Sequence, residues 1–239
     1  MDLIGTRVTV AMISMNEEQS VAIVIKKIQS VIPGAEILIV DSSNDQTPVI
    51  AFALGAKVIR QFPPRGYGVA MMTVLRESTR EVVVTMDCDD TYPTEKIPEL
   101  AALILDKDYD LVDGSRLKNK PRAMPWLNYF ANVFFAGIAS VFFLRKLTDL
   151  HSGMRAYRKS MIDELHFEAE GDALPVELLL KPILYGYNVH GVFIDYQERV
   201  GQSKMRPLKS AWWTLKRIIN IRLLNVNKLG ATKKNQGRL

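Results

Sequence analysis

The sequence is poor in the residues that support several common kinds of chemistry. Cys88 is the only cysteine among 239 residues, so an internal disulfide bond is impossible and a reducing compartment is the simplest interpretation. The first residues do not form a charged and then apolar leader, so secretion is not expected. Only three histidines occur, scattered along the chain, and the sequence offers no obvious general base.

Internal repeats and linkers rich in proline, glycine or serine are also absent. We therefore expect one catalytic domain over residues 1–208, followed by a basic amphipathic helix and tail over residues 209–239. The net charge of +5 favours anionic partners. Nucleic acid is not expected among them, because the basic residues are not interleaved with aromatic side chains on which bases could stack.

The first half of the chain alternates short apolar runs with helical patterns. Strands are predicted at 8–13, 36–40, 56–59, 81–86 and 109–112, and helices at 18–31, 47–54, 69–78 and 95–105. Further strands are predicted at 155–157 and 189–194, and a further helix at 175–185. Strands that are apolar throughout indicate a sheet covered on both faces. The pattern predicts a three-layer α/β/α domain with a mostly parallel central sheet.

Residues 126–144 form the longest apolar stretch, close to the roughly 20 residues that a membrane span requires. Polar and small side chains recur on one side of this helix. A single span would also place the motifs before and after it on opposite sides of a membrane. We therefore expect a buried or interfacial helix. The polar and small stripe consists of Asn128, Asn132, Ala136, Ala139 and Ser140.

An acidic cluster follows the predicted strand at 81–86. Asp87, Asp89 and Asp90 lie within four residues, and ligands bind at the carboxyl ends of strands in open α/β sheets. Such carboxylates repel one another unless a cation lies between them, and their hard oxygens suit Mg²⁺ or Mn²⁺. The alternative is a solvated acidic turn. The position after a buried strand favours a metal site that bridges to the phosphates of a nucleotide.

Two other strand ends carry related chemistry. Glu17 follows the first strand and Asp41 ends the second, so their carboxylates are candidates to bind a base or ribose. Ser, Asn and Asp are also good helix N-caps. We favour the capping role for Asp45 and Thr47, and the binding role for Glu17 and Asp41.

Taken in order, seven segments resemble the motifs of the GT-A glycosyltransferases of family two, and especially of the polyprenyl-phosphate (dolichyl-phosphate) mannosyl- and glucosyltransferases. Asp87-Cys88-Asp89 matches the family's Asp-x-Asp, and Arg199-Val200-Gly201-Gln202-Ser203-Lys204 matches the Arg-x-Gly-x-Ser-Lys of this subgroup. The other segments are 13–17, 41–47, 65–70, 113–116 and 147–158. Each motif is weak alone, but the ordered set is highly specific.

The resemblance implies roles for individual residues. Asp87 and Asp89 would hold the metal, and the catalytic residues would be Asp89, Arg199 and Lys204. The nucleotide-sugar would contact Ile13, Met15, Glu17, Ile39, Asp41, Asp87, Arg116, Arg199 and Lys204. Arg155 and Ser152 are candidates for the acceptor phosphate, although a structural salt bridge from Arg155 to Asp149 is an equal alternative. The chain departs from the family at Ile13, Met15, Ser42, Gln46 and Tyr129.

The implied reaction is inverting transfer of a hexose from a nucleotide-sugar, of the GDP-mannose or UDP-glucose type, to a polyprenyl phosphate. A phosphate monoester loses its second proton near pH 6, so this acceptor needs no strong base. The alternatives are a glycosyltransferase acting on a soluble or saccharide acceptor, and a non-catalytic membrane-associated protein that binds nucleotide-sugars.

The helix predicted near the C-terminus suits a membrane surface. Trp212, Leu215, Ile219 and Leu223 share one face of it, and basic residues lie largely elsewhere. This apolar face could instead pack on the domain. The sequence predicts peripheral attachment to the cytoplasmic face of a membrane.

Overall fold

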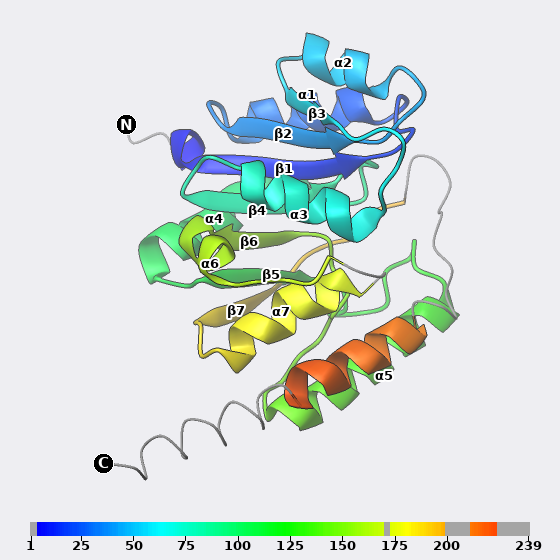
Figure 1. Cartoon of the computed structure of the whole chain (residues 1–239), viewed down its shortest axis with the longest axis vertical. Coiled ribbons are helices and arrows are strands. Elements are labelled where there is room, and N and C mark those ends of the chain that lie inside the picture. Colours follow the sequence, from blue (N-terminus) through cyan, green and yellow to red (C-terminus); the bar gives the residue numbers. More distant parts are fainter. Residues whose placement is uncertain (1–3, 170–172, 199–210, 224–239) are drawn as a thin grey trace.

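The computed structural model describes residues 4–169, 173–198 and 211–223. A seven-stranded sheet forms the centre of the molecule (Figure 1), with the strand order β3-β2-β1-β4-β6-β5-β7. The strands are β1 (Val8–Ser14), β2 (Glu36–Asp41), β3 (Lys57–Arg60), β4 (Val82–Asp87), β5 (Leu111–Ser115), β6 (Arg155–Arg158) and β7 (Val189–Phe193). Strand β6 runs antiparallel to both of its neighbours, whereas the other strand pairs are parallel.

Helices cover both faces of this sheet, which confirms the predicted three-layer α/β/α architecture. Buried side chains of α1, α2 and α4 form one core with the sheet, and those of α3, α5, α6, α7 and the helix at 211–223 belong to the other. The helices are α1 (Val21–Val31), α2 (Thr47–Ala53), α3 (Tyr67–Glu77), α4 (Ile97–Lys107), α5 (Trp126–Phe143), α6 (Lys159–Glu164) and α7 (Leu174–Leu184). Two short 3₁₀ turns, η1 (Ile4–Arg7) and η2 (Thr94–Lys96), complete the described elements.

The apolar strands follow from this double covering. Along β2, Ile37 and Ile39 pack into the core with α1, whereas Leu38 and Val40 face the core with α3. Successive side chains of a strand point to opposite faces, so a strand buried on both sides needs an apolar residue at each position. The predicted strands and long helices are confirmed to within a few residues. The sequence analysis missed α6, the two 3₁₀ turns and the place of β6 between β4 and β5.

Helix α5 is long and apolar enough to cross a membrane by length and composition alone. Only Phe135, Ala136 and Ala139 of this helix are buried, so the predicted alternative of a buried helix is wrong. The segments on either side of α5 return to the same sheet, where β5 and β6 pair directly. The arrangement therefore excludes a single crossing through α5 in this fold, as the topological argument from sequence had indicated.

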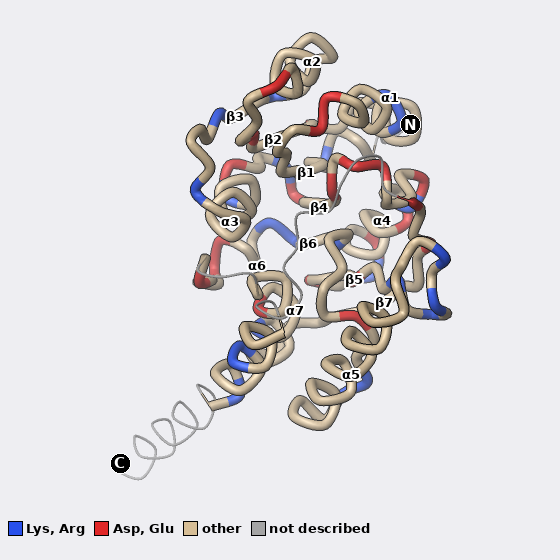
Figure 2. The backbone as a smooth tube through the Cα atoms, turned by 90° about the vertical axis from the view of Figure 1, so that its right-hand side faces the viewer, with Lys and Arg blue, Asp and Glu red and all other residues tan. Residues whose placement is uncertain are grey.

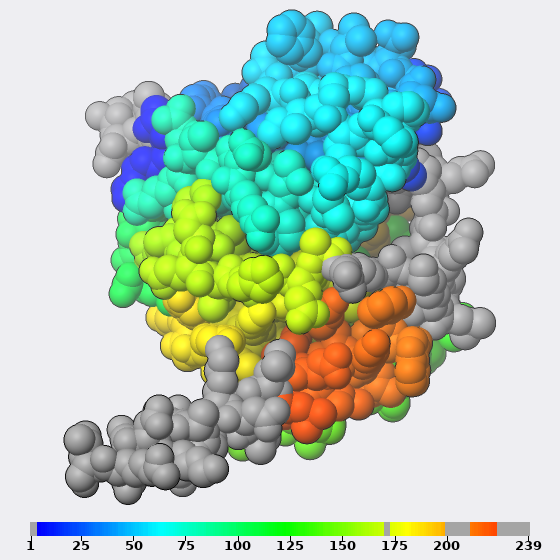
Figure 3. Space-filling model, in the orientation of Figure 1, coloured from blue at the N-terminus to red at the C-terminus, as the bar shows by residue number. Residues whose placement is uncertain are grey.

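The helix at 211–223 lies with α5 at one end of the molecule, far from α2 (Figures 1 and 2). In Figure 3 its surface, coloured orange, packs against the yellow and green segments. Its buried residues are Thr214, Arg217, Ile218 and Ile221. Another face exposes 66% of Trp212 and 56% of Leu223. One face of the helix therefore packs on the domain, as one alternative predicted, while the predicted apolar face stays largely exposed, and its contact with a membrane stays a prediction.

Candidate active site

The carboxyl ends of three neighbouring strands form the candidate site. Ser14 of β1 is in register with Asp41 of β2, and Ile13 of β1 is in register with Asp87 of β4. Adjacent strands are about 5 Å apart, so Asp41 and Asp87 lie about two strand spacings from each other. Residues separated by 46 positions in sequence therefore meet at one edge of the sheet, where ligands bind in open α/β folds.

The turn after β4 holds the predicted Asp-x-Asp motif in a defined conformation. Asp89 is 3% exposed, and its Oδ1 accepts hydrogen bonds from the Thr91 hydroxyl at 2.6 Å and the Thr91 amide at 3.2 Å. Asp90 adopts a left-handed backbone conformation with φ of 63°. Both of its carboxylate oxygens lie 2.7 Å from Lys27 Nζ of α1. Asp90 is thus occupied by an ion pair, which leaves Asp87 and Asp89 as the candidates for a metal.

These two carboxylates fit part of a magnesium or manganese site. They supply hard oxygen atoms at a partly exposed strand end, where Asp87 is half-buried. Within residues 4–169, 173–198 and 211–223, no group of three or more His, Cys, Asp or Glu side chains is placed to hold a metal ion. The described protein residues alone therefore do not complete a coordination sphere, and a bound metal would take further oxygens from phosphate groups or water.

Asp41 is fully buried at the end of β2. Its Oδ1 accepts a hydrogen bond from the Ser14 hydroxyl at 3.1 Å, and its Oδ2 accepts one from the Ser43 amide at 2.9 Å. The guanidinium of Arg60, at the end of β3, forms an ion pair with the same Oδ2 and donates to the Ser43 carbonyl at 2.8 Å. Asp41 therefore organises this strand end, and the more exposed Arg60 is a site residue that the sequence analysis missed.

The other residues predicted to contact the nucleotide occupy different environments. Ile13 is partly buried, Met15 is 37% exposed, and Glu17 is partly buried with its amide donating to Thr47 Oγ1 at 2.9 Å. These three lie at or just beyond the end of β1. Ile39 differs, because its side chain is fully buried in the core with α1. Because this side chain has no exposed surface, the structure lends no support to its predicted contact with the nucleotide, which stays a prediction.

Arg116 is held by a carboxylate that lies 33 residues away in sequence. Its Nε is 2.7 Å from Asp149 Oδ2, and its Nη2 is 3.0 Å from Asp149 Oδ1. The Arg116 amide also donates to Asp149 Oδ2 at 3.3 Å. The guanidinium lies 5.1 Å from the ring centroid of Tyr196, a distance suited to a cation–π interaction. Two faces of Arg116 are thus fixed by protein groups at the end of β5.

Arg155 and Ser152 are buried rather than open to an acceptor. The Arg155 side chain is 1% exposed, and its Nε lies 2.6 Å from Asp113 Oδ1. Its other nitrogens donate to the carbonyls of Pro175 and Leu150. Ser152 is also 1% exposed, and its hydroxyl donates to the Gly114 carbonyl at 2.5 Å.

The donors of Arg155 and Ser152 are thus satisfied inside the protein, so the structure lends no support to their predicted acceptor-phosphate roles, which stay predictions. The alternative prediction, a salt bridge from Arg155 to Asp149, is wrong in its partner. Arg155 pairs with Asp113, and Asp149 pairs with Arg116. Both arginines nevertheless form structural salt bridges under the sheet edge.

Two tyrosines that the sequence analysis missed surround the Asp-x-Asp turn. Tyr92 and Tyr196 pack edge to face with ring centroids 5.6 Å apart, and the Tyr92 hydroxyl accepts a hydrogen bond from the Gly153 amide at 2.7 Å. A β-carbon at Gly153 would lie 3.1 Å from this hydroxyl and 3.3 Å from both Asp87 oxygens. A β-carbon at this position would therefore force Tyr92 or Asp87 to shift by a few tenths of an ångström.

The chain after β7 returns to the same turn. The Gln197 amide donates to the Thr91 carbonyl at 2.9 Å, so the residues that lead up to 198 run beside the Asp-x-Asp motif. Arg199 and Lys204, predicted as catalytic and phosphate-binding residues, lie outside the described residues. Their roles remain predictions, and they follow directly on a segment in contact with the site.

Residues 9–166 match the glycosyl transferase family 2, and the chain belongs to that family. It is 43% identical over 199 residues to a dolichyl-phosphate hexose transferase of Haloferax volcanii. The aligned region covers 83% of this chain and 86% of the relative. It is 28% identical over 214 residues to an undecaprenyl-phosphate mannosyltransferase of Micrococcus luteus, with 83% and 87% of the two chains covered.

Solved structures support the fold. Glucosyl-3-phosphoglycerate synthase of Mycobacterium tuberculosis, crystallised with Mn²⁺, UDP and glucosyl-3-phosphoglycerate, matches with a TM-score of 0.70. The match covers 91% of this chain and 79% of that one at 21% identity. At this identity the likeness establishes the GT-A fold, and the predicted fold class is confirmed.

Proposed function

We propose that this chain transfers a hexose from a nucleotide-sugar to a polyprenyl phosphate at a membrane surface, with inversion at the anomeric carbon. The similarity to the Haloferax volcanii dolichyl-phosphate hexose transferase carries the proposal, because it extends over 83% of this chain and 86% of that relative. The Micrococcus luteus relative is likewise described as acting on a polyprenyl phosphate. The nucleotide and sugar remain of the GDP-mannose or UDP-glucose type.

The proposed site would bind the donor at the ends of β1, β2 and β4. Asp87 and Asp89 would hold Mg²⁺ or Mn²⁺, which when bound would neutralise charge on the diphosphate leaving group. Arg116, Arg199 and Lys204 would add cationic groups toward that diphosphate. The acceptor phosphate is ionised at neutral pH, so it can attack without a protein base. The scarcity of histidine in the sequence agrees with this requirement.

A membrane surface is the proposed location of the acceptor. Helix α5 exposes large apolar side chains along most of its length, and the helix at 211–223 exposes Trp212, Ile219 and Leu223. Basic residues accompany them: Lys120 Nζ lies 4.8 Å from the Trp126 ring centroid. Apolar side chains bordered by cations suit the boundary between acyl chains and anionic headgroups. The exposed large apolar residues of α5 and its C-cap are Trp126, Leu127, Phe130, Val133, Phe134, Val141, Phe142 and Leu144.

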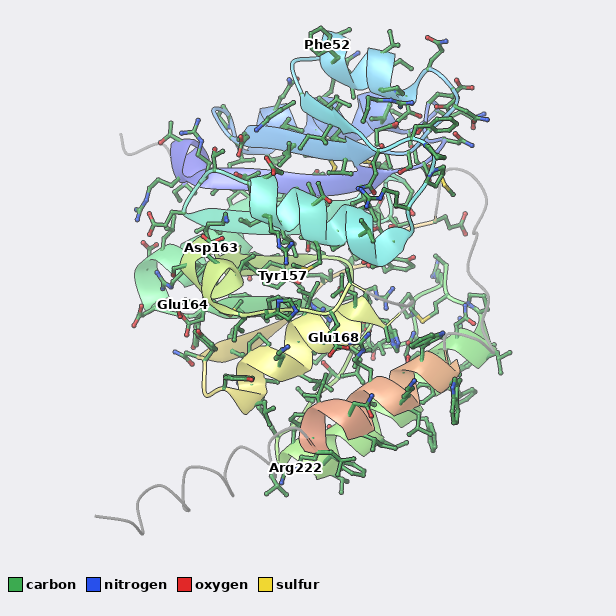
Figure 4. All side chains as sticks on the ribbon, in the orientation of Figure 1. Phe52, Tyr157, Asp163, Glu164, Glu168 and Arg222 are labelled. Carbon is green, nitrogen blue, oxygen red and sulfur yellow. The ribbon has the colours of Figure 1, made fainter. Side chains whose placement is uncertain are left out.

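Vesicle flotation tests this location. Phe130→Asp and Trp212→Asp should each weaken binding to vesicles of phosphatidylcholine and phosphatidylglycerol, because a carboxylate would enter the apolar boundary. Phe52→Asp is the matched control, since Phe52 is 74% exposed on α2 at the opposite end of the molecule (Figure 4). Equal flotation of all three variants and the wild type would contradict a membrane-facing role for α5 and the helix at 211–223.

The acceptor is tested by substrate competition. Wild-type protein is offered one labelled nucleotide-sugar together with polyprenyl phosphate or a short water-soluble alcohol, and the organic and aqueous phases are counted separately. We expect label in the organic phase. Label only in the soluble product would favour the alternative acceptor class, and nucleotide-sugar binding without transfer would favour the non-catalytic alternative.

A further inference from the structure

The helix at 211–223 has an inner face that reaches the candidate active site. Thr214 is 1% exposed, and its Oγ1 lies 2.8 Å from Nε2 of His151. One turn further along, Arg217 Nη1 lies 2.5 Å from Glu177 Oε2 of α7 and 2.8 Å from Glu168 Oε2. The two contacts fix both the position and the rotation of the helix against the domain. Its opposite face carries the exposed Trp212 and Leu223.

His151 joins this helix to the Arg116–Asp149 pair. The His151 amide donates to Asp149 Oδ1 at 3.0 Å, the same oxygen that accepts from Arg116 Nη2. The imidazole ring also packs edge to face against Phe135 of α5, with centroids 6.4 Å apart. A single residue thus contacts both surface helices with its side chain and the site carboxylate with its backbone.

The ring nitrogens of His151 indicate which way the bond to Thr214 runs. Nδ1 is buried without a hydrogen-bond partner in the described part of the chain. A bare acceptor nitrogen costs less when buried than an unsatisfied N–H donor. The arrangement therefore assigns the proton to Nε2, which donates to Thr214 Oγ1, and leaves Nδ1 unprotonated.

From Asp149 the contacts continue to the proposed metal carboxylate. Arg116 lies against the ring of Tyr196, which packs on Tyr92. The Tyr92 hydroxyl accepts a hydrogen bond from the Gly153 amide, and Gly153 lies against Asp87. The chain of contacts from the helix at 211–223 to the sheet edge is therefore continuous.

We infer that His151 and Thr214 are positioning residues, which hold Asp149 and Arg116 in place for the diphosphate of the nucleotide-sugar by fixing the helix at 211–223 to the site. The inference rests on the proposed function, because it assigns Arg116 a role toward the diphosphate leaving group. Neither residue needs to touch a substrate. The same helix would then meet the lipid surface with one face and order the site with the other.

Paired substitutions at residue 214 test this inference. Thr214→Val keeps the shape of the side chain but removes the hydroxyl, whereas Thr214→Ser keeps the hydroxyl. Asn220→Ala, on an exposed position of the same helix, is the control for general effects on the helix. The readout is hydrogen exchange at the amides of His151 and Arg116, because both amides donate to Asp149.

We expect hydrogen exchange at these two amides to become about tenfold faster in Thr214→Val. This factor corresponds to the free energy that one buried hydrogen bond contributes. Thr214→Ser and Asn220→Ala should exchange like the wild type. Unchanged exchange in Thr214→Val would overturn the inference. Equal acceleration at a core amide such as that of Val10 in β1 would also overturn it, because it would indicate general destabilisation instead of a local link.

Kinetics then separate this inference from the proposed function. Thr214→Val should raise the KM for the nucleotide-sugar about tenfold and leave the KM for polyprenyl phosphate unchanged, with rescue in Thr214→Ser. An unchanged KM for the nucleotide-sugar would overturn the positioning role. Absence of lipid transfer by the wild type would contradict the proposed function, and the amide exchange would still decide whether Thr214 holds the Asp149 site.

Discussion

Arg116 and Asp149 form a bidentate ion pair beneath the candidate site, with nitrogen–oxygen distances of 2.7 and 3.0 Å. The Arg116 side chain is 9% exposed and that of Asp149 is fully buried. Burial alone would raise the pKa of Asp149, but the Arg116 guanidinium and the hydrogen bonds to this carboxylate lower it to about 2. The pair therefore stays charged at neutral pH.

Removal of the carboxylate should be costly. Asp149→Ala would leave the Arg116 guanidinium buried without its partner, and we expect a loss of roughly 3–5 kcal/mol in the free energy of unfolding, measured by urea denaturation. Asp163→Ala is the comparison, because Asp163 forms a surface pair with Lys159 and lies away from the site (Figure 4). That variant should lose less than about 1 kcal/mol. Equal losses would contradict the structural importance of the Arg116–Asp149 pair.

A methyl group added at residue 153 should disturb Asp87, one of the two proposed metal ligands. In Gly153→Ala the new β-carbon would lie 3.3 Å from both Asp87 oxygens and 3.1 Å from the Tyr92 hydroxyl, so at least one of them must move. We expect the transfer rate to fall about tenfold or more, because catalytic groups tolerate little displacement. Gly137→Ala in α5 is the matched control, since a β-carbon there meets nothing within 4 Å. Full activity in Gly153→Ala would show that Asp87 need not stay in this position.

The pH dependence of stability should include a contribution from His151. Burial lowers its pKa from 6.5 to about 4, although the Asp149 carboxylate opposes the shift. Between these two pH values the unfolded chain binds a proton that the folded protein does not. The stabilisation is therefore complete above pH 6.5 and is lost as the pH falls toward 4.

The difference amounts to roughly 3 kcal/mol for a shift of this size. Urea denaturation at pH 7 and pH 4.5 gives the free energy of unfolding of the wild type and of His151→Gln. The contribution of His151 is the part of the pH dependence that is present in the wild type and absent from the variant. Parallel curves for the two proteins would mean that His151 titrates with its ordinary pKa in the folded state.

Local patterns in the sequence were enough to predict most of the fold. The strands β1, β2 and β4 and the polar residues that end them could be located because apolar runs and turn residues are adjacent in sequence. Strand β6 could not be placed, because its four residues pair with strands about 70 and 45 positions away. Nothing in the sequence of Arg155–Arg158 distinguishes an antiparallel strand inserted between β4 and β5 from a strand at an edge.

The site was predicted less completely, for a related reason. The carboxylates Asp41, Asp87 and Asp89 follow directly from strand ends, but the partners of buried charges depend on tertiary contacts. Arg155 meets Asp113 at a separation of 42 residues, which no helical or strand spacing indicates. Alternation along β2 puts Ile37 and Ile39 on one face, and their common burial in the core with α1 is a signal that the sequence analysis did not use when it assigned Ile39 to the pocket.

Transfer to lipid by the wild type and by Asp89→Asn is the most direct measurement of the central claim. Both proteins are incubated with radiolabelled UDP- and GDP-sugars, polyprenyl phosphate and Mg²⁺ or Mn²⁺, and label is counted in the organic phase, with Asp163→Asn as the surface control. We predict lipid-linked sugar from one donor with the wild type and Asp163→Asn, and a loss of at least a hundredfold, roughly 3 kcal/mol, with Asp89→Asn. Undiminished lipid-linked product from Asp89→Asn would contradict the proposed active site.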